Sequence, residues 1–331
     1  MILAAVDAGG TRTRASIVQN SFGCGGVGLA GRGNPVSAGP DAAFAEIAAA
    51  LGRAAAQAGV SLGQIDAVTL ASAGGSVFDE GFLAGALAGV GIGAPFARKG
   101  DLAALFCSGT HESSGYSLVA GTGATAVRIV DSAEVQTIDG LGWLLGDTGS
   151  GFWIGHQVAR AVASALDGRT ATSMVAPALE VLGIEPDLAV RAGRPVASHE
   201  LIRVVYTESP FVLAALAPVA FLDDGDEVSS GIVKEAAHGL AQAVIDVHAD
   251  DVAGPLVLGG GVMTGQPRLR ERTVAALRAA GLTLQVIDAA DGLVGASVLA
   301  LRDAGVTVDA AAFETLRSTT AAQLARATAA L

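Results

Sequence analysis

The sequence predicts an α/β fold made of two duplicated domains with a cleft between them. Three observations support this prediction. The chain begins with an apolar strand that runs into a glycine and threonine turn and then a second strand, over residues 1–18. A similar pattern returns over residues 116–130, roughly a hundred residues later, at the distance expected for a duplicated domain. Beyond each hairpin, short apolar strands alternate with helical stretches, as they do in α/β proteins.

The composition is that of a globular protein with an aliphatic core. The chain has 331 residues, which is enough for two domains, and it is 51% hydrophobic but only 4% aromatic. Its net charge is −12, with no basic face of the kind a nucleic-acid binder carries. No apolar run approaches the ~20 residues of a membrane span, and no basic segment precedes the first apolar run. We therefore expect a cytoplasmic protein that binds neither nucleic acid nor membrane.

The opening strand ends in the stretch Asp7-Ala8-Gly9-Gly10-Thr11-Arg12-Thr13. Such an ending brings bare backbone N–H groups and small hydroxyl donors to one point, which suits a phosphate. Asp7 cannot bind a phosphate itself, but it can hold the Mg²⁺, or the Mg²⁺-bound water, that accompanies a nucleotide. A strand followed by a tight glycine turn explains the stretch equally well.

The next elements are a second strand at 14–18 and a glycine-rich segment at 23–28. The segment matches G-x-G-x-x-G, but a dinucleotide site must open a helix, and the residues up to Asn34-Pro35 cannot start one. A glycine-rich hairpin is therefore predicted. Asn34 fits turn chemistry before a proline, although its amide could also face a ligand. A helix is expected over 40–59.

A strand over 66–71 leads into a glycine pair that includes Gly74, followed by a helix near 79–90 and an extended segment at 94–98. Asp101 then opens an apolar helix. An aspartate in this place is usually an N-cap that satisfies free N–H groups. It could equally be an acid exposed at the carboxyl end of a strand, where α/β folds bind ligands.

The repeated hairpin carries Gly121-Thr122-Gly123, and two such hairpins could clamp a polyphosphate from both sides. A glycine-rich stretch at 139–154 then contains both tryptophans and predicts a packed wall beside a cleft. Asp147 in this stretch is either a structural loop acid or a ligand to sugar hydroxyls. Ser150 is a good N-cap for a helix near 150–166.

The remainder is helical over about 167–250, including a long amphipathic helix at 228–248. A strand then runs into Gly259-Gly260-Gly261, where bare backbone lets a flat base approach, although a flexible turn would need glycine too. A helix at 265–281, a strand at 284–287 and a helix at 292–304 follow. The tail helix at 309–331 either packs on the first domain or forms an oligomer contact.

Several chemistries are excluded by the motifs that the sequence lacks. The five histidines have no metal-ligand spacing, and two distant cysteines make neither a disulfide framework nor a metal cluster. There is no G-x-x-x-x-G-K-S/T loop and no G-x-S-x-G nucleophile elbow. A P-loop nucleotide site is thereby excluded.

Taken together, these stretches resemble the actin/hexokinase/Hsp70 superfamily of ATP-dependent phosphotransferases. Within it they resemble the N-acetylglucosamine kinases and the BadF/BadG-type ATPases. The first phosphate motif, D-x-G-G-T-x-T, stands at residues 7–13, and the second, with G-T-G, at 121–123. The adenosine motif stands at 258–261, and the helix start of the family at 292–296. The signature G-D-E-G-S-x-x-x-I-G stands at 146–155 with Thr148 in place of Glu.

The resemblance implies two actin-like, ribonuclease H-like domains around the cleft. The first would span residues 1–118, joined by the tail helix at 309–331, and the second would span 119–308 and carry the adenosine site. Asp7 would organise the Mg²⁺ of ATP, through water, and Asp101 would be the catalytic base. The implied ATP-binding residues are Asp7, Gly9, Gly10, Thr11, Thr13, Gly121, Thr122, Gly123, Gly259, Gly260 and Gly261. The implied sugar-binding residues are Asn34, Gly74, Asp101, Thr122, Thr125, Leu141 and Asp147.

The activity implied is an ATP-dependent hexosamine kinase acting on the 6-hydroxyl of an amino sugar, with N-acetylglucosamine as the first candidate. The family often has Trp at Leu141, Glu at Thr148 and Asn at or near Thr125, so unacetylated glucosamine is the alternative. A more remote alternative is an ATP-driven activator of a redox enzyme, which would need cluster-binding cysteines that Cys24 and Cys107 do not resemble. A non-catalytic sugar sensor would not need Asp101. A homodimer is expected.

Overall fold

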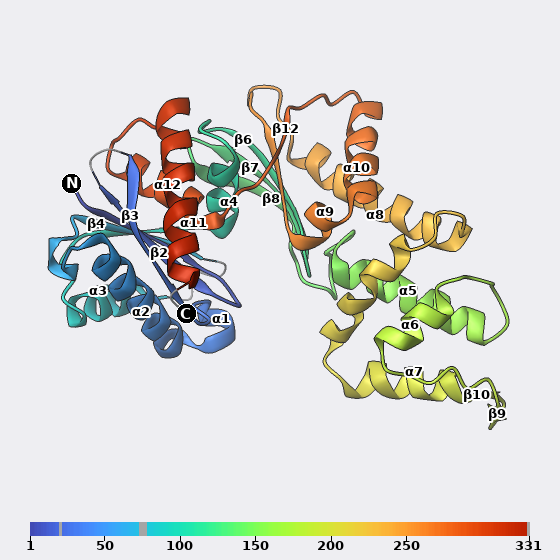
Figure 1. The fold of residues 1–331 in the computed structure, drawn as a ribbon. Helices are drawn as coiled ribbons and strands as arrows, with labels where there is room; N and C mark the ends of the chain where they lie inside the picture. Colours follow the sequence, from blue (N-terminus) through green and yellow to red (C-terminus); the bar gives the residue numbers. More distant parts are fainter. Residues whose placement is uncertain (20–21, 73–77, 330–331) are drawn as a thin grey trace.

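The computed structural model describes residues 1–19, 22–72 and 78–329, and it contains two five-stranded sheets placed side by side (Figure 1). In the first sheet the strand order is β3-β2-β1-β4-β5, and in the second it is β8-β7-β6-β11-β12. The first sheet consists of β1 (Leu3–Ala8), β2 (Thr13–Gln19), β3 (Gly23–Ala30), β4 (Ala67–Ser72) and β5 (Phe96–Lys99). The second consists of β6 (Gly115–Ala120), β7 (Ala124–Val130), β8 (Ala133–Asp139), β11 (Leu256–Gly259) and β12 (Val286–Asp288).

The two sheets have the same topology. In each, the first three strands in chain order form an antiparallel meander, and the last two add in parallel beside the first strand. Antiparallel strands can follow one another through tight turns, whereas parallel strands need a long crossover, and helices supply it in both halves. The prediction of a duplicated α/β fold is confirmed.

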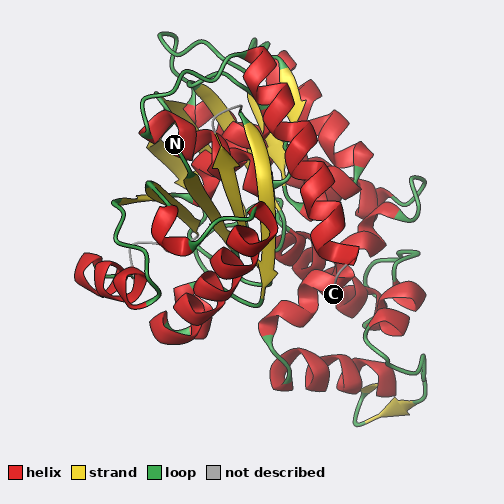
Figure 2. Ribbon diagram, turned by 60° about the vertical axis from the view of Figure 1, so that its left-hand side comes forward, coloured by secondary structure: helices red, strands yellow, loops and turns green. Residues whose placement is uncertain are grey.

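Helices cover both sheets (Figure 2). Around the first sheet lie α1 (Pro35–Ala38), α2 (Pro40–Ala58), α3 (Glu80–Gly89) and α12 (Ala310–Ala329). With the second sheet are α5 (Gly151–Leu166), α6 (Val175–Val181), α7 (Val196–Thr207), α8 (Glu227–Val247), α9 (Gly261–Gly265) and α10 (Pro267–Ala279). Short elements complete this half, namely the 3₁₀ segment Pro210–Phe221 and the small hairpin of β9 (Val190–Arg191) and β10 (Arg194–Pro195). No helix within the described residues is long and apolar enough to cross a membrane.

Two further helices, α4 (Asp101–Gly109) and α11 (Gly292–Asp303), join the halves. Successive side chains of a strand point to opposite faces, so in β1 one set packs with α2 and α3 while the other faces α4 and α11. Helix α4 follows the first sheet but packs mainly on strands of the second, and α11 follows the second sheet but packs on the first. These crossing helices also pack on each other, and together they lie at the junction between the halves.

The contact between the crossing helices depends on a glycine. A Cβ atom added at Gly295 of α11 would overlap the carbonyl oxygen of Ala104 in α4. We therefore expect Gly295→Ala to lower the free energy of unfolding by about 1–3 kcal/mol, the usual cost of overpacking. Urea denaturation measures this change. Gly52→Ala in α2, where an added Cβ meets no atom within 4 Å, should instead raise it by about 1 kcal/mol. Equal stabilities of the two variants would contradict this packing.

The structure refines several expected elements. The glycine-rich segment at 23–28 forms β3, and an added Cβ at Gly26 or Gly28 would overlap the backbone of α2, so these glycines serve helix packing. Strand β8 was missing from the predicted elements.

The tail helix α12 packs on β3, where the Cys24 N–H donates to Thr319 Oγ1 at 3.0 Å. The expected domain boundary after residue 118 falls inside β6, and the division into residues 1–118 and 119–308 stays a prediction.

Candidate active site

A cavity of about 470 Å³ lies where the two crossing helices begin. It is bounded by the ends of β1 and β11, the segment after β12, and the first turns of α4 and α11. Its volume is within the range of small-molecule sites, and its position at the carboxyl ends of strands is where α/β proteins bind ligands. The lining residues are Asp7, Arg14, Asp101, Ala104, Leu105, Gly259, Gly260, Gly261, Thr264, Ala289, Ala290, Asp291 and Gly292.

The cavity brings together five residues predicted from the sequence: Asp7, Asp101 and the three glycines of 259–261. Asp101 is the first residue of α4, and the N-cap position belongs to Gly100, which makes no side-chain capping bond. Asp101 is thus the first helical residue and not the N-cap residue. The carboxyl group stands exposed at the wall of the cavity, beside the positive end of the α4 dipole.

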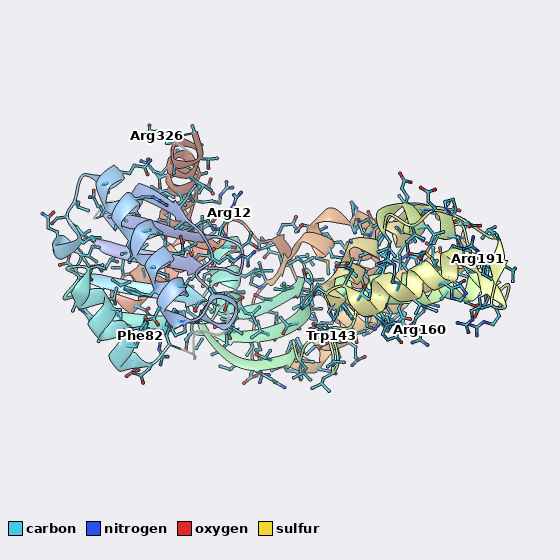
Figure 3. All side chains as sticks on the ribbon, turned by 90° about the horizontal axis from the view of Figure 1, so that it is seen from below. Arg12, Phe82, Trp143, Arg160, Arg191 and Arg326 are labelled. Carbon is cyan, nitrogen blue, oxygen red and sulfur yellow. The ribbon has the colours of Figure 1, made fainter. Side chains whose placement is uncertain are left out.

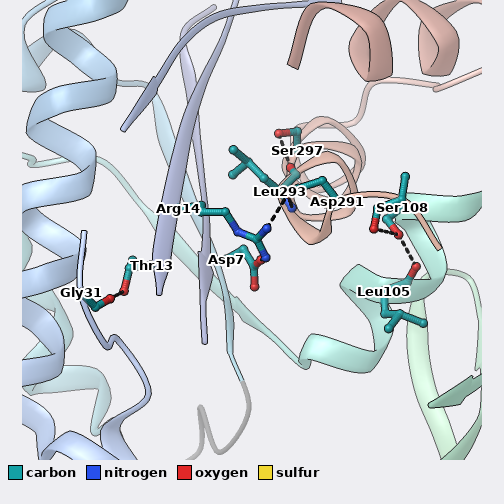
Figure 4. Close-up of polar contacts among 10 residues, drawn as sticks. Asp7, Thr13, Arg14, Gly31, Leu105, Ser108, Asp291, Leu293 and Ser297 are labelled. Carbon is teal, nitrogen blue, oxygen red and sulfur yellow. Dashed lines mark hydrogen bonds and ion pairs between the residues drawn. The ribbon is translucent and has the colours of Figure 1, made fainter. Parts of the chain in front are cut away.

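Arg14 joins two carboxylates on one wall of this cavity (Figure 4). Its Nη2 lies 2.5 Å from Asp7 Oδ2, and its Nη1 lies 2.6 Å from Asp291 Oδ2. Asp291 also caps α11, because its Oδ1 accepts from the Leu293 N–H at 2.9 Å. Arg14 and Asp291 were absent from the predicted site. Arg14 could have been found, because the hairpin register places it directly opposite Asp7.

Two acids of the cavity, Asp7 and Asp101, hold their protons more strongly than ordinary aspartates. Burial raises the pKa of Asp7, although the neighbouring Arg14 guanidinium opposes the shift. The surrounding protein raises the pKa of Asp101 as well, and the negative charge of Asp7 adds to this effect. Several acids crowded in one place require a compensating cation. Arg14 supplies one positive charge, and the negative charge that remains favours the binding of a further cation.

A Mg²⁺ ion carried by a nucleotide fits this donor set. Mg²⁺ takes oxygen ligands, usually one or two carboxylates together with phosphates and waters. Asp7 and Asp291 offer two carboxylates tied to the same guanidinium. Among the described residues there is no group of three or more acidic, histidine or cysteine side chains that could hold a metal alone.

The triple glycine forms another part of the cavity wall. Strand β11 ends at Gly259, and Gly260 has a φ of +89°, in the region that favours glycine. An added Cβ at Gly260 would overlap the carbonyl of Ala120, and one at Gly259 would meet Leu105 of α4. Close packing therefore requires glycine at positions 259 and 260. Together with Gly261 they leave bare backbone facing the cavity, as a flat ligand would need.

The second hairpin borders the cavity without lining it. Gly121 lies beside Gly260, with an added Cβ at Gly121 3.9 Å from the Gly260 Cα atom. The start of α5 holds the hairpin, because Gly151 and Phe152 donate N–H groups to the carbonyls of Gly121 and Thr122 at 2.7 and 3.2 Å. Ser150 caps α5, as predicted, by accepting from the Trp153 N–H at 3.0 Å. The hairpin is thus fixed next to the glycine wall.

The first hairpin is placed differently. The turn of Gly9, Gly10 and Thr11 joins β1 to β2, and Gly10 and Thr11 are exposed, but none of the three lines the cavity. Thr13 is fully buried, and its hydroxyl donates to the Gly31 carbonyl at 2.8 Å. Its observed contact is therefore structural, within the sheet.

Of the residues predicted to bind sugar that the structure describes, Asp101 lines this cavity and the others do not. Asn34 caps α1 by accepting from the Val36 N–H at 2.8 Å. Asp147 is 7% exposed, and its Oδ1 accepts from the Ala124 N–H at 3.3 Å, a structural contact to the second hairpin. Thr125 donates to the Ile138 carbonyl at 3.3 Å. Gly74 lies outside the described residues.

The loop before α5 presents apolar side chains to solvent. Leu141 is 65% exposed, and Leu144 and Leu145 are 75% and 79% exposed. Trp143, labelled in Figure 3, lies on the same loop. Its ring centre is 5.1 Å from that of Phe152 in α5. The sequence predicted a packed wall beside a cleft from residues 139–154, but here the leucine side chains of this loop are mostly uncovered, and no residue of the stretch lines the cavity.

Comparisons with known proteins agree with this architecture. The model of the BadF/BadG/BcrA/BcrD ATPase family matches residues 5–300. A putative N-acetylglucosamine kinase from Chromobacterium violaceum aligns with a TM-score of 0.65 at 22% identity, over 90% of this chain and 98% of that one. A putative N-acetylglucosamine kinase from Porphyromonas gingivalis aligns with a TM-score of 0.65 at 20% identity, over 92% and 100%.

A ROK family glucokinase from Streptomyces griseus, solved with glucose and AMPPNP, aligns with a TM-score of 0.50 at 16% identity, over 91% of this chain and 100% of that one. No curated protein matches. At these identities the likenesses show the fold alone, and they confirm the expected pair of actin-like domains.

Proposed function

The chain belongs to the BadF/BadG/BcrA/BcrD ATPase family, and on this premise we propose that it is an ATP-dependent kinase of an amino sugar. One observation carries the proposal. A single cavity at the junction of the two halves holds an exposed acid, Asp101, beside a charged wall of Asp7, Arg14 and Asp291 and a wall of bare glycine backbone. These are the parts that phosphoryl transfer requires: a base, charge compensation and a nucleotide platform.

The nucleotide would occupy the space between the glycine wall and the charged wall. Gly260 and Gly261 would face the adenine, and the hairpin of Gly121–Gly123 would approach the phosphates. Asp7 and Asp291 would hold Mg²⁺, which when bound neutralises charge on the phosphate oxygens. Arg14 adds a guanidinium with several N–H donors, a group well suited to phosphate oxygens. The first turns of α4 and α11 also favour negative charge in the cavity.

Asp101 would accept the proton of the attacking sugar hydroxyl. A sugar CH₂OH group is a poor nucleophile in water, and a carboxylate within reach removes its proton as the oxygen attacks the γ-phosphorus. The raised pKa of Asp101 makes its carboxylate a stronger base than an ordinary aspartate. Closure of the two halves would exclude water, which otherwise competes as the acceptor.

The proposed acceptor is the 6-hydroxyl of N-acetylglucosamine, with unacetylated glucosamine as the second candidate. Two proteins of the same fold carry the name putative N-acetylglucosamine kinase, and a third was solved with glucose and AMPPNP. Glucosamine is kept because Leu141 and Thr125 differ from the residues that the family often has at these positions. Thr148 departs from the family signature on the loop beside the second hairpin. Thr148 packs against Gly239 of α8, where an added Cβ would overlap its methyl group.

The alternative of a redox-enzyme activator is not favoured by the cysteines. An iron–sulfur cluster needs thiolate ligands at the place where the cluster sits. Cys24 and Cys107 are both buried and belong to different core clusters. Burial raises the pKa of each thiol to about 11, so neither is a ready thiolate. The expected homodimer and the expected cytoplasmic location stay predictions.

An ADP-release assay tests the kinase function. Purified protein with Mg²⁺ and ATP is offered N-acetylglucosamine, glucosamine, N-acetylmannosamine or glucose, each with and without EDTA. We expect one of the two glucosamine compounds to stimulate ADP release most strongly, and EDTA to abolish the stimulation. If no sugar stimulates ADP release, the kinase proposal is wrong.

A further inference from the structure

Helix α4, which presents Asp101, receives a capping contact from a residue far from it in the sequence. The N–H groups in the first turn of a helix lack partners within the helix and need outside acceptors. Gly100 at the N-cap position has no side chain to offer. Instead, the Ala103 N–H donates to Oε1 of Glu134 at 2.9 Å. Glu134 belongs to β8 in the second sheet, so the helix is capped from the other half of the molecule.

A β-bulge places Glu134 on the correct face. In the pairing of β7 with β8, Arg128 is opposite Gln136 and Ile129 is opposite Glu134, which leaves Val135 as an extra residue. Ile129 lies on the buried face that packs against α4. Without the extra residue, Val135 would oppose Ile129, and Glu134 would point to the other face. Bulges of this kind often re-aim a side chain beside an active site.

The glycine at position 100 allows the Glu134 carboxylate to come close to the start of α4. A Cβ added at Gly100 would overlap the Glu134 carboxylate, so any other residue there would push this carboxylate away. Glu134 is also close enough for the Asp101 charge to act on it, because that charge, together with burial, raises the pKa of Glu134. An acid held next to another acid is costly, and the first turn of α4 is the feature that compensates the cost.

We infer that Glu134 is a positioning residue for Asp101: it fixes the first turn of α4 against the second sheet, and so sets the direction of the Asp101 carboxylate. The inference rests on the proposed function for its kinetic consequences, but the capping contact does not depend on it. Because Glu134 and Asp101 come from different halves, the base is aligned only when α4 is seated on the second sheet. Glu134 itself is not a lining residue of the cavity.

Three variants of the full-length protein test this role. Glu134→Ala removes the acceptor, and we expect kcat for the best sugar to fall about 10- to 100-fold, since a misplaced catalytic group costs about that much. The KM for ATP should change by less than twofold. Glu134→Gln keeps an acceptor oxygen at the same place and should restore most of the turnover. Gln136→Ala, on the same strand, is the control and should leave kcat unchanged.

Hydrogen exchange of α4 gives a readout that is independent of activity. The amides of peptides covering residues 101–105 should exchange faster in Glu134→Ala than in the native protein, and at near-native rates in Glu134→Gln. Gly100→Ala leaves Glu134 in the sequence but displaces its carboxylate. We therefore expect the amide exchange rates of α4 and the kcat of this variant to match those of Glu134→Ala.

Native kcat in Glu134→Ala, or equal losses in Glu134→Ala and Glu134→Gln, would overturn the positioning role. Unchanged exchange in Glu134→Ala would overturn the capping contact itself. If no sugar is phosphorylated by the native protein, the kinase proposal fails, whereas the exchange experiment still decides whether Glu134 caps α4.

Discussion

Asp101→Asn is expected to lower turnover by about 10²- to 10⁴-fold while leaving nucleotide affinity almost unchanged. This is the usual contribution of a general base, and asparagine keeps the size of the side chain but cannot accept the proton of the sugar hydroxyl. Asp101 is the first residue of α4 and exposed to the cavity, so the change should not disturb the fold. Steady-state kinetics give kcat, and titration with a fluorescent ATP analogue gives the affinity.

The matched control is Asp41→Asn. Asp41 is likewise an exposed acid in the first turn of a helix, α2, but it does not line the cavity. Any effect of losing a helix-terminal charge should appear in both variants, and only Asp101→Asn should lose turnover. Near-normal turnover in Asp101→Asn would reduce Asp101 to a helix-terminal acid.

The same assignment predicts a pH dependence. The base must be ionised to act, so activity should fall as the pH drops through the pKa of Asp101. Desolvation by the surrounding protein, together with the charge of Asp7, raises that pKa above its ordinary value of 3.8. The acid limb of kcat/KM for the sugar should therefore lie above pH 3.8, and it should be missing from the residual activity of Asp101→Asn. An unchanged limb in that variant would assign the ionisation to another group.

Arg14→Gln is expected to raise the KM for Mg·ATP roughly 10- to 100-fold, as expected for the loss of a charge-assisted hydrogen bond. Arg14 is paired with Asp7 and Asp291, and without it these carboxylates face each other uncompensated in the cavity. The cavity then becomes more negative and repels the nucleotide. Arg14→Lys should recover part of the affinity, since it keeps the charge but cannot bridge both acids with one planar group. Nucleotide titration and KM measurements should agree.

The control for Arg14 is Arg270→Gln. Arg270 also pairs with an aspartate, Asp288 at 3.2 Å, but it does not line the cavity. Its replacement should leave the affinity for Mg·ATP unchanged. Equal affinities in Arg14→Gln and the native protein would mean that Arg14 serves only to join the first sheet to the start of α11.

The duplicated fold and the outline of the nucleotide site could be predicted from the sequence because local signals specify them. The strand and glycine hairpins at 1–18 and 116–130 determine where each meander begins, and both sheets are built on them. Asp7, Asp101 and Gly259–Gly261 share a cavity because each follows a strand or begins a crossing helix at the same junction.

The remaining features depend on tertiary contacts that no local pattern carries. Glu134 reaches α4 only through a bulge in β8. Helices α4 and α11 each pack on the sheet of the other half, and this arrangement determines which acidic residues line the cavity. Motif matching also cannot tell a ligand from a structural polar group. Thr13 belongs to the phosphate motif, yet its hydroxyl is used by the Gly31 carbonyl. Asp147, in the signature stretch, contacts the second hairpin through the Ala124 N–H.

The most direct test of the kinase account follows the fate of the γ-phosphate. Native protein is incubated with Mg²⁺, γ-labelled ATP and either N-acetylglucosamine or glucosamine, and the products are separated and analysed by mass spectrometry. We predict a labelled sugar 6-phosphate in an amount equal to the ADP formed. Label recovered only as inorganic phosphate, with ADP released but no phosphorylated sugar, would contradict sugar phosphorylation and leave an ATPase.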